Sequence, residues 1–325
     1  MRAMILAGGL STRLYPLTKQ VPKPLVPVLG EPNAAHLIRY LKQYGFGEIA
    51  INVHYLSGAI VQALGDGSAF GVRIEYLHEK ELLGSAGAVE QMKWFFSGEP
   101  FVVVGCDDLT DLRLDALLAF HAEKHAVATI GLVEREDVAQ YGVVVTDETG
   151  KITGFQEKPP RGTELSNFVN TGIYAFSPQI FDHIPKGEFY DFGKNVFPAL
   201  QQAGEAFYGF DARGAYWCDI GTPDEYRRAT DDVLNGIFTI PGRRAPNGNV
   251  WIGAGASVAK SAAILGPSVV GEGVEVQAGA RIEHSIIWQG SLIGAGAVVR
   301  NAIVGMNYRV GASTTIEDTI VANEA

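Results

Sequence analysis

The sequence predicts an α/β fold with a mostly parallel sheet over residues 1–236, followed by a smaller all-β repeat region over residues 247–325. Two patterns carry this prediction. Short apolar strands alternate with amphipathic helices up to about residue 235, and aliphatic residues then recur every six positions. The chain has 325 residues and 47% apolar content, which is enough for two buried cores. We place a linker at residues 237–246, where Pro, Gly and Arg cluster.

Composition excludes several classes of protein. The formal net charge of -10 disfavours a nucleic-acid partner, because binding a phosphate backbone normally needs a basic face. The apolar stretch before Gly8 is too short for a signal peptide, and no run approaches the length of a membrane span. The two cysteines, Cys106 and Cys218, cannot build a disulfide framework. We therefore expect a cytoplasmic protein with no membrane partner.

The first strand, predicted at residues 3–6, runs into a loop suited to binding phosphate. Gly8 and Gly9 let backbone N–H groups approach an anion, while Ser11 and Thr12 offer short donors and Arg13 a planar fork of N–H groups. Four cations and no carboxylate occur in the first 30 residues of this acidic chain, which indicates a local anion site. A glycine pair alone often marks only a turn, and the string matches neither the P-loop nor the Rossmann motif.

The longer string from Gly8 to Thr18, followed by Pro22-Lys23-Pro24, resembles the signature of sugar nucleotidyltransferases, also called nucleotide-sugar pyrophosphorylases. This resemblance covers the whole chain. It implies that Arg13 neutralises the phosphates of a nucleoside triphosphate and that Lys23 contacts phosphate. The family usually has glycine where this chain has Ser11. The nucleotide contacts that it implies in this loop are Leu6, Ala7, Gly8, Gly9, Ser11 and Thr12.

The remaining elements of the first region follow in alternation. Further strands are predicted at 49–53, 101–104 and 128–132, with helices at 36–44, 86–95 and 114–125. In such sheets ligands bind beyond the carboxyl ends of the strands, where the glycine loop lies.

Two glycines separated by small residues open the helix predicted at 86–95. The segment Leu83-Gly-Ser-Ala-Gly87-Ala could serve only tight helix packing. It also resembles the family segment L-G-T-A-G-A, which contacts the nucleotide base. That resemblance implies nucleotide contacts from Gly84, Ser85 and Gly87.

Two predicted strands end in a carboxylate, Asp107 and Asp219. An acid at a strand end is frequently only a turn former or helix cap. Their surroundings resemble the family segments N-G-D and W-x-D-x-G-T-P, which implies that both ligate Mg²⁺, an ion that prefers carboxylate and phosphate oxygens. Gly105-Cys106 departs from the family's Asn-Gly. A cysteine precedes each aspartate, and because adjacent strand residues face opposite ways, we expect packed, inert thiols.

Three further segments resemble the family's sugar-binding stretches Y-G-V, F-x-E-K-P and N-x-G-I-Y. Taken alone, Glu157 and Lys158 would be a surface ion pair of small energetic value. The resemblance implies contacts to the sugar or its phosphate from Gly142, Glu157, Lys158, Asn170 and Thr171.

The C-terminal region is a hexapeptide repeat. Its aliphatic anchors begin at Ile252 and keep a step of six, which drops to five after Ile282 and again after Val299. The pattern resembles a left-handed parallel β-helix of roughly four coils, with about 18 residues per coil. Such solenoids offer faces for assembly, so we expect a homo-oligomer formed through the β-helix. An acyltransferase of this fold would need a basic histidine in a cleft, and His284 is the region's only histidine.

The resemblance implies an enzyme that converts an NTP and a hexose 1-phosphate to an NDP-hexose and pyrophosphate. We favour GTP with mannose 1-phosphate, and keep UTP or dTTP with glucose 1-phosphate as the alternative. An inactive regulatory paralogue that binds nucleotide sugars is a further alternative. It would be expected to lose Arg13, Lys23, Asp107 or Asp219, all of which are present.

Overall fold

The computed structural model describes residues 1–96, 98–243 and 248–323, which form two compact units. The first unit comprises Met1–Gly9 with Leu37–Trp217, and the second comprises Leu10–His36 with Cys218–Ala325. The predicted domains follow sequence order, whereas each compact unit joins segments that are distant in sequence. Of the linker predicted at 237–246, residues 244–246 lie outside the described part of the chain.

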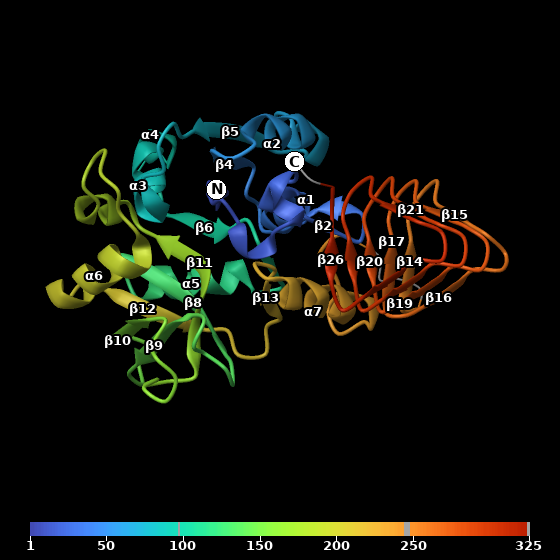
Figure 1. The fold of residues 1–325 in the computed structure, drawn as a ribbon. Helices are drawn as coiled ribbons and strands as arrows, with labels where there is room; N and C mark the ends of the chain where they lie inside the picture. The colour runs from blue at the N-terminus through green and yellow to red at the C-terminus, as the bar shows by residue number, and fades with distance from the viewer. Residues whose placement is uncertain (97, 244–247, 324–325) are drawn as a thin grey trace. The chain divides into compact units, whose positions relative to one another are not determined.

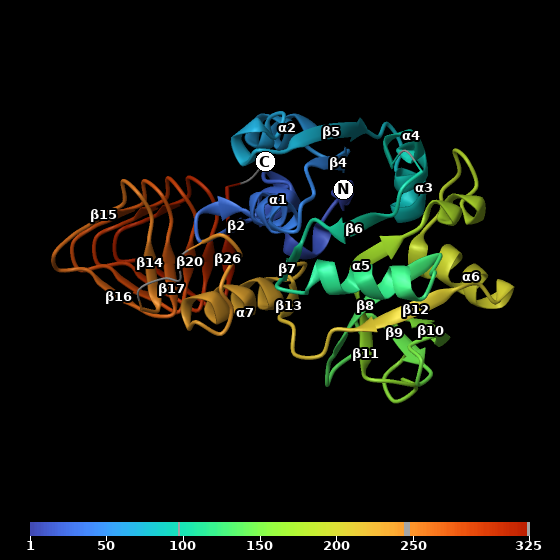
Figure 2. The ribbon, with the colours of Figure 1, turned by 180° about the vertical axis from the view of Figure 1, so that it is seen from behind.

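One nine-stranded sheet forms the centre of the first unit (Figures 1 and 2). Its main path runs β10-β9-β11-β6-β1-β4-β5, and β8 and β12 extend it from β11. The strands are β1 (Arg2–Leu6), β4 (Glu48–Val53), β5 (Arg73–His78), β6 (Phe101–Gly105), β8 (Ala128–Glu134), β9 (Gly142–Thr146), β10 (Ile152–Glu157), β11 (Phe168–Phe176) and β12 (Phe207–Asp211).

The sheet is parallel in one part and antiparallel in another. β1 pairs in parallel with β4 and β6, and β4 with β5, as the alternation of strands and helices predicts. β11 instead runs antiparallel to β6, β8 and β9, and β9 runs antiparallel to β10. The chain passes from β8 through β9 and β10 to β11 without a helix, so these strands lack the crossover that parallel pairing needs.

Most of the helices belong to the first unit, whereas α7 belongs to the second. The predicted helix at 86–95 is divided at Met92 into two helices, α3 and α4. α5 packs on β8, β11 and β12, and lies in front of them in Figure 2. The helices are α1 (Asn33–Gln43), α2 (Ser57–Leu64), α3 (Gly84–Gln91), α4 (Lys93–Phe96), α5 (Leu114–Glu123), α6 (Phe197–Ala203) and α7 (Pro223–Leu234).

Stacked phenylalanines fill much of the core of the first unit. The rings of Phe96 and Phe101 stack with centroids 3.8 Å apart, and those of Phe176 and Phe192 with centroids 4.8 Å apart. All four side chains are fully buried. Each buried aromatic side chain removes a large apolar area from water, so this cluster fixes the helices against the sheet.

The hexapeptide region forms three parallel sheets, as expected for a β-helix (Figure 1). The first two coils are offset by 18 residues, as in Val250↔Ser268, and the later ones by 17, as in Val269↔Ile286. These offsets confirm the steps of six and five seen in the sequence. The strands run from β14 (Val250–Ile252) to β26 (Ile320–Val321) and include β17 (Ser268–Val270), β20 (Ile286–Ile287) and β23 (Ile303–Val304).

Apolar anchors of the repeat point into the β-helix and form its core. Val270, Ile282, Ile293 and Val304 are buried in this cluster with the small side chain of Ala297. A repeat buries such a core only by stacking on its neighbours, which explains why the anchors recur in every coil.

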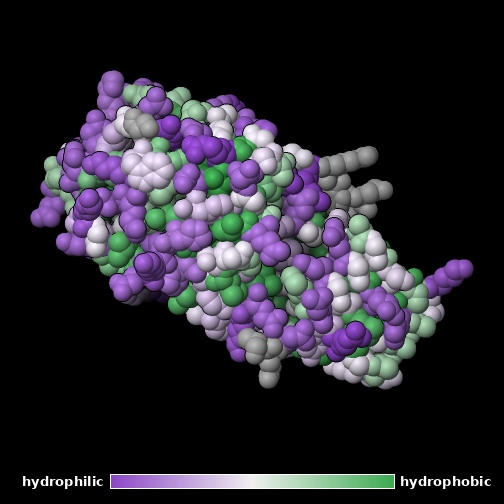
Figure 3. All heavy atoms as spheres, turned by 90° about the horizontal axis from the view of Figure 1, so that it is seen from above, coloured by the Kyte–Doolittle hydropathy of each residue, from purple (hydrophilic) through white to green (hydrophobic). Residues whose placement is uncertain are grey.

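Among the described residues, no helix is long and apolar enough to cross a membrane. On the face shown in Figure 3, hydrophobic residues lie in separate patches among hydrophilic ones.

Buried His121 makes the stability of the first unit sensitive to pH. Its two ring nitrogens lie 2.9 Å from the hydroxyls of Thr129 and Ser177. Because Ser177 donates to the carbonyl of Ala126, its oxygen accepts the hydrogen bond from Nε2. Burial lowers the pKa of His121 from 6.5 to about 4.

We expect His121 to contribute stability that is lost as the pH falls from 6.5 to about 4. The unfolded chain takes up the proton first, so the free energy of unfolding decreases across this window, by about 3 kcal/mol for a shift of this size. Denaturant unfolding gives the free energy of unfolding of the wild type and of His121→Gln. The difference between these two free energies should become smaller from pH 7 to pH 4.5. His125→Asn, an exposed neighbour, is the control, and an unchanged difference for His121→Gln would contradict the prediction.

Candidate active site

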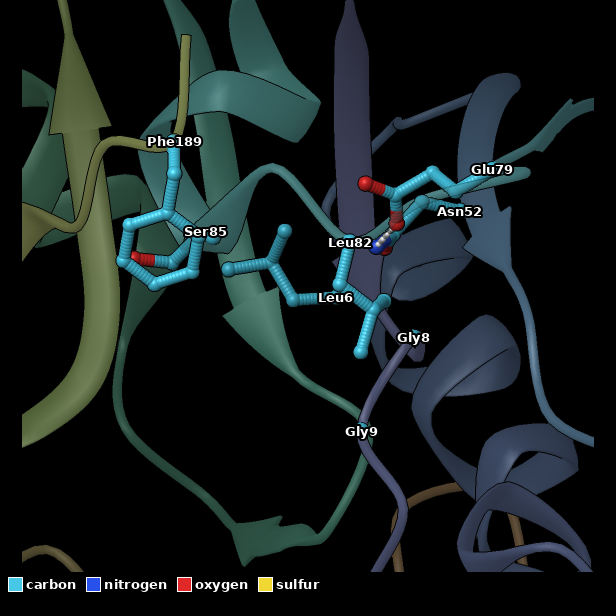
Figure 4. Close-up of a pocket in the computed structure, with 9 residues that line it drawn as sticks. Leu6, Gly8, Gly9, Asn52, Glu79, Leu82, Ser85 and Phe189 are labelled. Atoms are coloured by element: carbon cyan, nitrogen blue, oxygen red, sulfur yellow. Dashed lines mark hydrogen bonds between the residues drawn. The ribbon is translucent and has the colours of Figure 1, made fainter.

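A pocket of about 230 Å³ lies beside the glycine loop at the carboxyl end of β1 (Figure 4). Five of the residues predicted to bind nucleotide line it. Its other lining residues were not predicted from the sequence. The predicted residues are Leu6, Gly8, Gly9, Gly84 and Ser85, and the additional ones are Asn52, Glu79, Leu82 and Phe189.

A buried amide and carboxylate support the wall of this pocket. Asn52 Oδ1 accepts a hydrogen bond from the backbone N–H of Ala7 at 2.9 Å, and its Nδ2 donates to Glu79 Oε2 at 2.6 Å. Glu79 Oε1 accepts from the N–H of Leu83 at 3.3 Å. The pair thus ties the start of the glycine loop to the segment before α3. The sequence signal was a polar Asn52 inside an otherwise apolar strand.

Gly8 packs directly on this pair. A Cβ at Gly8 would lie 2.8 Å from both Asn52 Nδ2 and Glu79 Oε2, closer than real Cβ contacts allow. At Gly9, in contrast, a Cβ would meet nothing within 4 Å. The first glycine is therefore required by packing in the protein itself, and the second leaves an open backbone surface.

Both glycines of α3 serve close packing. A Cβ at Gly84, where φ is +75°, would lie 2.5 Å from the carbonyl oxygen of Tyr190, and one at Gly87 would lie 2.8 Å from that of Glu188. The Tyr190 carbonyl also accepts hydrogen bonds from the N–H groups of Ala86 and Gly87. The packing interpretation thus has direct support, while base contact by Gly84 and Gly87 stays a prediction.

Ser85 holds the opposite side of the pocket. Its hydroxyl donates to Asp191 Oδ2 at 2.8 Å and accepts from the N–H of Phe192 at 2.9 Å. The side chain of Phe189 lies beside Ser85 in Figure 4. Ser85 therefore acts as a bridge between α3 and the segment that carries Phe189.

The cationic part of the predicted site lies in the second unit and gathers around Asp219. Arg13 Nη2 lies 3.8 Å from Asp219 Oδ2, and Lys23 Nζ lies 3.6 Å from Asp219 Oδ1. The Lys23 side chain is only 12% exposed, whereas that of Arg13 is 53% exposed. Two cations around one carboxylate leave a net positive charge, which is suited to a phosphate group.

Local backbone structure sets the direction of these cations. Ser11 has φ = 55°, in the left-handed region that favours glycine, which explains why the family usually has glycine there. Its carbonyl accepts hydrogen bonds from the Thr18 hydroxyl and the Leu14 N–H. Thr12 lies exposed at the start of the 3-10 helix η1 (Thr12–Leu14), which carries Arg13.

Asp219 ends the short strand β13 (Trp217–Asp219), four residues before α7 begins. Thr222 caps α7 by accepting the N–H of Glu225, and Pro223 occupies its first position, which are the usual helix-start signals. The strand end and the helix start therefore hold Asp219 from both sides.

Asp107 lies in the first unit, next to a second aspartate with a structural role. Asp108 accepts hydrogen bonds from the indole N–H of Trp217 at 2.9 Å and from the N–H of Gly105 at 3.0 Å. Asp107 is half-buried at the turn after β6. A Cβ at Gly105 would lie 3.0 Å from Asp107 Oδ1, so a larger residue there would crowd the carboxylate.

Three of the predicted sugar-binding residues meet in the first unit. A Cβ at Gly142 would lie 3.3 Å from Glu157 Oε2 and 3.4 Å from the Cβ of Asn170. Burial raises the pKa of Glu157, which Lys158 opposes and Asp191 reinforces. Lys158 Nζ lies 3.9 Å from Glu157 Oε1 and is 59% exposed, so it can reach a ligand.

Thr171 is placed differently from the other predicted sugar contacts. It is buried, and its hydroxyl donates to the carbonyl of Gly131 at 2.8 Å and accepts from the N–H of Ile173. Its hydroxyl is therefore used within the protein, and sugar contact by Thr171 stays a prediction. Asn170 accepts the N–H of Gly172 and donates to the Tyr174 hydroxyl.

Both cysteines are buried, as the strand alternation predicts. Cys218 Sγ lies 3.3 Å from Glu225 Oε2 and from Arg228 Nη2, and burial raises the pKa of its thiol well above the usual range. Such a thiol is a poor nucleophile.

Comparison with known proteins gives consistent matches over the two predicted regions. Residues 2–236 match the family described as nucleotidyl transferase, and residues 246–325 match the GMPPB C-terminal domain. The chain is 38% identical over 318 residues to UTP--glucose-1-phosphate uridylyltransferase of Synechocystis sp., covering 87% of this chain and 82% of that protein.

Two further relatives extend the comparison. The mannose-1-phosphate guanylyltransferase of Mycobacterium tuberculosis is 34% identical over 285 residues, covering 86% of this chain and 78% of that protein. The crystal structure of HddC from Yersinia pseudotuberculosis matches with a TM-score of 0.62 and 27% identity, over 71% of this chain and 98% of that one.

The contrast between the two loop glycines is testable by stability. Gly8→Ala should lower the free energy of unfolding by about 1–3 kcal/mol, because the new methyl group overlaps the Asn52–Glu79 pair. Gly9→Ala is the matched control and should stay within about 0.5 kcal/mol of the wild type. Denaturant unfolding measures both variants, and equal effects would contradict the close packing at Gly8.

Proposed function

This chain belongs to the nucleotidyl transferase family and is a sugar-1-phosphate nucleotidyltransferase, and we propose that it joins GTP and mannose 1-phosphate to GDP-mannose and pyrophosphate. The observation that carries the site assignment is the cluster of Arg13, Lys23 and Asp219, with distances of 3.6 and 3.8 Å. A second support is the pocket beside the glycine loop, whose walls combine Leu6 and Phe189 with backbone of glycines.

The chemistry needs positioning more than proton transfer. The second pKa of a sugar phosphate is about 6, so the attacking oxygen is already mostly ionised at pH 7. That oxygen forms a bond to the α-phosphorus while the bond to pyrophosphate breaks, and pyrophosphate leaves with the electron pair. The protein must bring two polyanions together and stabilise the added charge of the transition state.

Each residue has a part in this proposal. Arg13 and the backbone from Gly8 to Thr12 bind the triphosphate, and Lys23 clamps a phosphate close to Asp219. Lys158 reaches the sugar phosphate, while Glu157 and Asn170 bind sugar hydroxyls beside Gly142. Arg13 supplies a planar fork that can span two phosphate oxygens, which a lysine cannot reproduce.

Asp107 and Asp219 fit the donor chemistry of a divalent metal site, for which we propose Mg²⁺. Both are carboxylates, the ligand type that Mg²⁺ prefers, and Asp219 lies within 4 Å of Arg13 and Lys23. In the described part of the chain, no group of three or more His, Cys, Asp or Glu side chains is arranged to hold a metal ion. The proposed site has only two carboxylates, and the phosphates of the substrate would supply the other ligands. When bound, the ion would neutralise phosphate charge.

The choice of base and sugar remains between two substrate pairs. The match of residues 246–325 to the GMPPB C-terminal domain favours GTP with mannose 1-phosphate. The relative at 38% identity is named for UTP and glucose 1-phosphate, which supports the alternative pair, with dTTP in place of UTP as a variant of it. An inactive regulatory paralogue would bind nucleotide sugars without turnover.

We further propose that the β-helix is left-handed and that it carries a homo-oligomer interface. A cytoplasmic location is proposed from the low cysteine count of the chain.

A matrix of four NTPs against glucose 1-phosphate and mannose 1-phosphate, read by pyrophosphate release, tests the substrate assignment. We expect the highest kcat/KM for GTP with mannose 1-phosphate. A tenfold preference for UTP or dTTP with glucose 1-phosphate, about 1.4 kcal/mol in transition-state binding, would replace this assignment. Release of pyrophosphate from no pair would support the inactive paralogue.

Asp219→Asn should lower kcat at least a hundredfold, about 2.7 kcal/mol, because it removes charge from the proposed metal ligand. Asp107→Asn should lower kcat to a similar extent, for the same reason. Asp137→Asn, at an exposed ion pair with Arg161, is the control for loss of a carboxylate elsewhere. Near-normal rates for either variant at saturating Mg²⁺ would remove that residue from the metal site.

A further inference from the structure

A short hairpin follows Lys23, and three distant side chains donate hydrogen bonds to its backbone. It consists of β2 (Pro27–Val28) and β3 (Glu31–Pro32), joined by Leu29 and Gly30. Both joining residues have positive φ, as a two-residue hairpin turn requires. The hairpin belongs to the second unit, together with α7 and the β-helix.

Three consecutive carbonyls of the hairpin accept hydrogen bonds from three distant residues. The Tyr226 hydroxyl donates to the carbonyl of Pro27 at 2.5 Å. His36 Nε2 donates to that of Val28, and Arg243 Nη1 to that of Leu29, each at 3.0 Å. The turn already determines the local conformation of this six-residue hairpin, so the three hydrogen bonds fix its position.

Two tryptophans of the β-helix contact Tyr226 and the hairpin. Trp288 Nε1 donates to the Tyr226 hydroxyl at 3.0 Å, and the two rings meet edge to face with centroids 6.4 Å apart. Both side chains are fully buried. Trp251 of β14 packs on Gly30 so closely that a Cβ there would lie 2.3 Å from the indole. α7 and β2 both lie beside the β-helix in Figures 1 and 2.

The hairpin leads directly into the turn that carries Lys23. The 3-10 helix η3 (Lys23–Leu25) ends one residue before β2, and the N–H of Val26 donates to the Lys23 carbonyl at 3.1 Å. Prolines on either side of Lys23 restrict the backbone further. A displacement of Pro27 would therefore move Lys23 rather than be absorbed between them.

Tyr226 also lies close in sequence to Asp219. It is the fourth residue of α7, the helix that starts four residues after Asp219. One hydroxyl thus joins the helix behind Asp219, the hairpin behind Lys23 and the indole of Trp288. The ammonium and carboxylate that it supports are 3.6 Å apart.

We propose that Tyr226, oriented by Trp288, is a positioning residue for Lys23, so that the β-helix sets the geometry of the phosphate site in its own chain. This inference rests on the proposed function for Lys23 as a phosphate contact. Tyr226 touches no substrate and acts through the Pro27 carbonyl. The β-helix then has a role within each chain in addition to any role in assembly.

Equilibrium binding of pyrophosphate with Mg²⁺, measured by calorimetry on the full chain, tests the proposal through a double-mutant cycle. Tyr226→Phe keeps the ring and removes the hydroxyl. It should raise the Kd for pyrophosphate at least fivefold in the wild-type background and less than twofold in Lys23→Ala. In turnover the same variant should raise the KM for the triphosphate more than it lowers kcat. If Tyr226 has a purely structural role, Tyr226→Phe should lower the unfolding temperature. Its effect on the pyrophosphate Kd should then be the same in the wild-type and Lys23→Ala backgrounds.

Trp288→Phe provides a second, milder variant that removes only the N–H donor. It should raise the pyrophosphate Kd at least threefold, and combining it with Tyr226→Phe should add less than a further twofold, because both act on one hydroxyl. Trp94→Phe, on the exposed side of α4, is the matched control. An unchanged Kd in folded Trp288→Phe, or independent effects of the two substitutions, would overturn the proposal.

These outcomes are distinct from failure of the proposed function. A wild type that binds pyrophosphate but releases none from any NTP and sugar phosphate would refute the enzymatic activity, and the binding cycle would still decide the role of Tyr226. A wild type that turns over normally with an unchanged cycle would refute only the positioning role.

Discussion

The site that we propose for phosphate depends on one electrostatic arrangement, in which the Asp219 carboxylate lies between Arg13 and Lys23. Two cations so close together repel each other, and the carboxylate offsets that repulsion while the chain is without substrate. The net positive charge that remains is available to phosphate. Because Lys23 is largely buried, its charge is poorly screened by water and its position has to be fixed by the surrounding backbone.

The pocket beside the glycine loop depends on close packing at its glycines. Gly84 and Gly87 let the segment ending at Tyr190 approach α3, and this approach brings Phe189 and Ser85 to the pocket wall. Gly8 makes room for the Asn52–Glu79 hydrogen bond, which in turn holds Ala7 at the start of the loop. Close packing at these glycines therefore builds the pocket that we propose for the nucleotide.

The β-helix provides a rigid body of a kind that a single helix or hairpin cannot. Its coils of 17 or 18 residues bury aliphatic anchors in register, so its surface residues are fixed relative to one another. Trp251 and Trp288 come from different coils. Trp251 packs on Gly30, whereas Trp288 donates to the Tyr226 hydroxyl, which in turn donates to the Pro27 carbonyl. The stacked coils thus present two tryptophans at a fixed spacing, one against the hairpin and one against α7.

The sequence by itself determined the elements and their chemistry. Strand and helix periods placed β1, β4 and β6, and the six-residue repeat predicted the coils down to their five-residue steps. It could not determine the antiparallel pairing of β11 or the hydrogen bond between buried Asn52 and Glu79. Nor could it determine the hydrogen bond from Tyr226 to Pro27. The reason is physical: periodicity and capping are local, whereas each of these contacts joins residues far apart in the chain. Tertiary structure alone decided that residues 10–36 pack with the C-terminal part, because only folding brings Gly30 against Trp251.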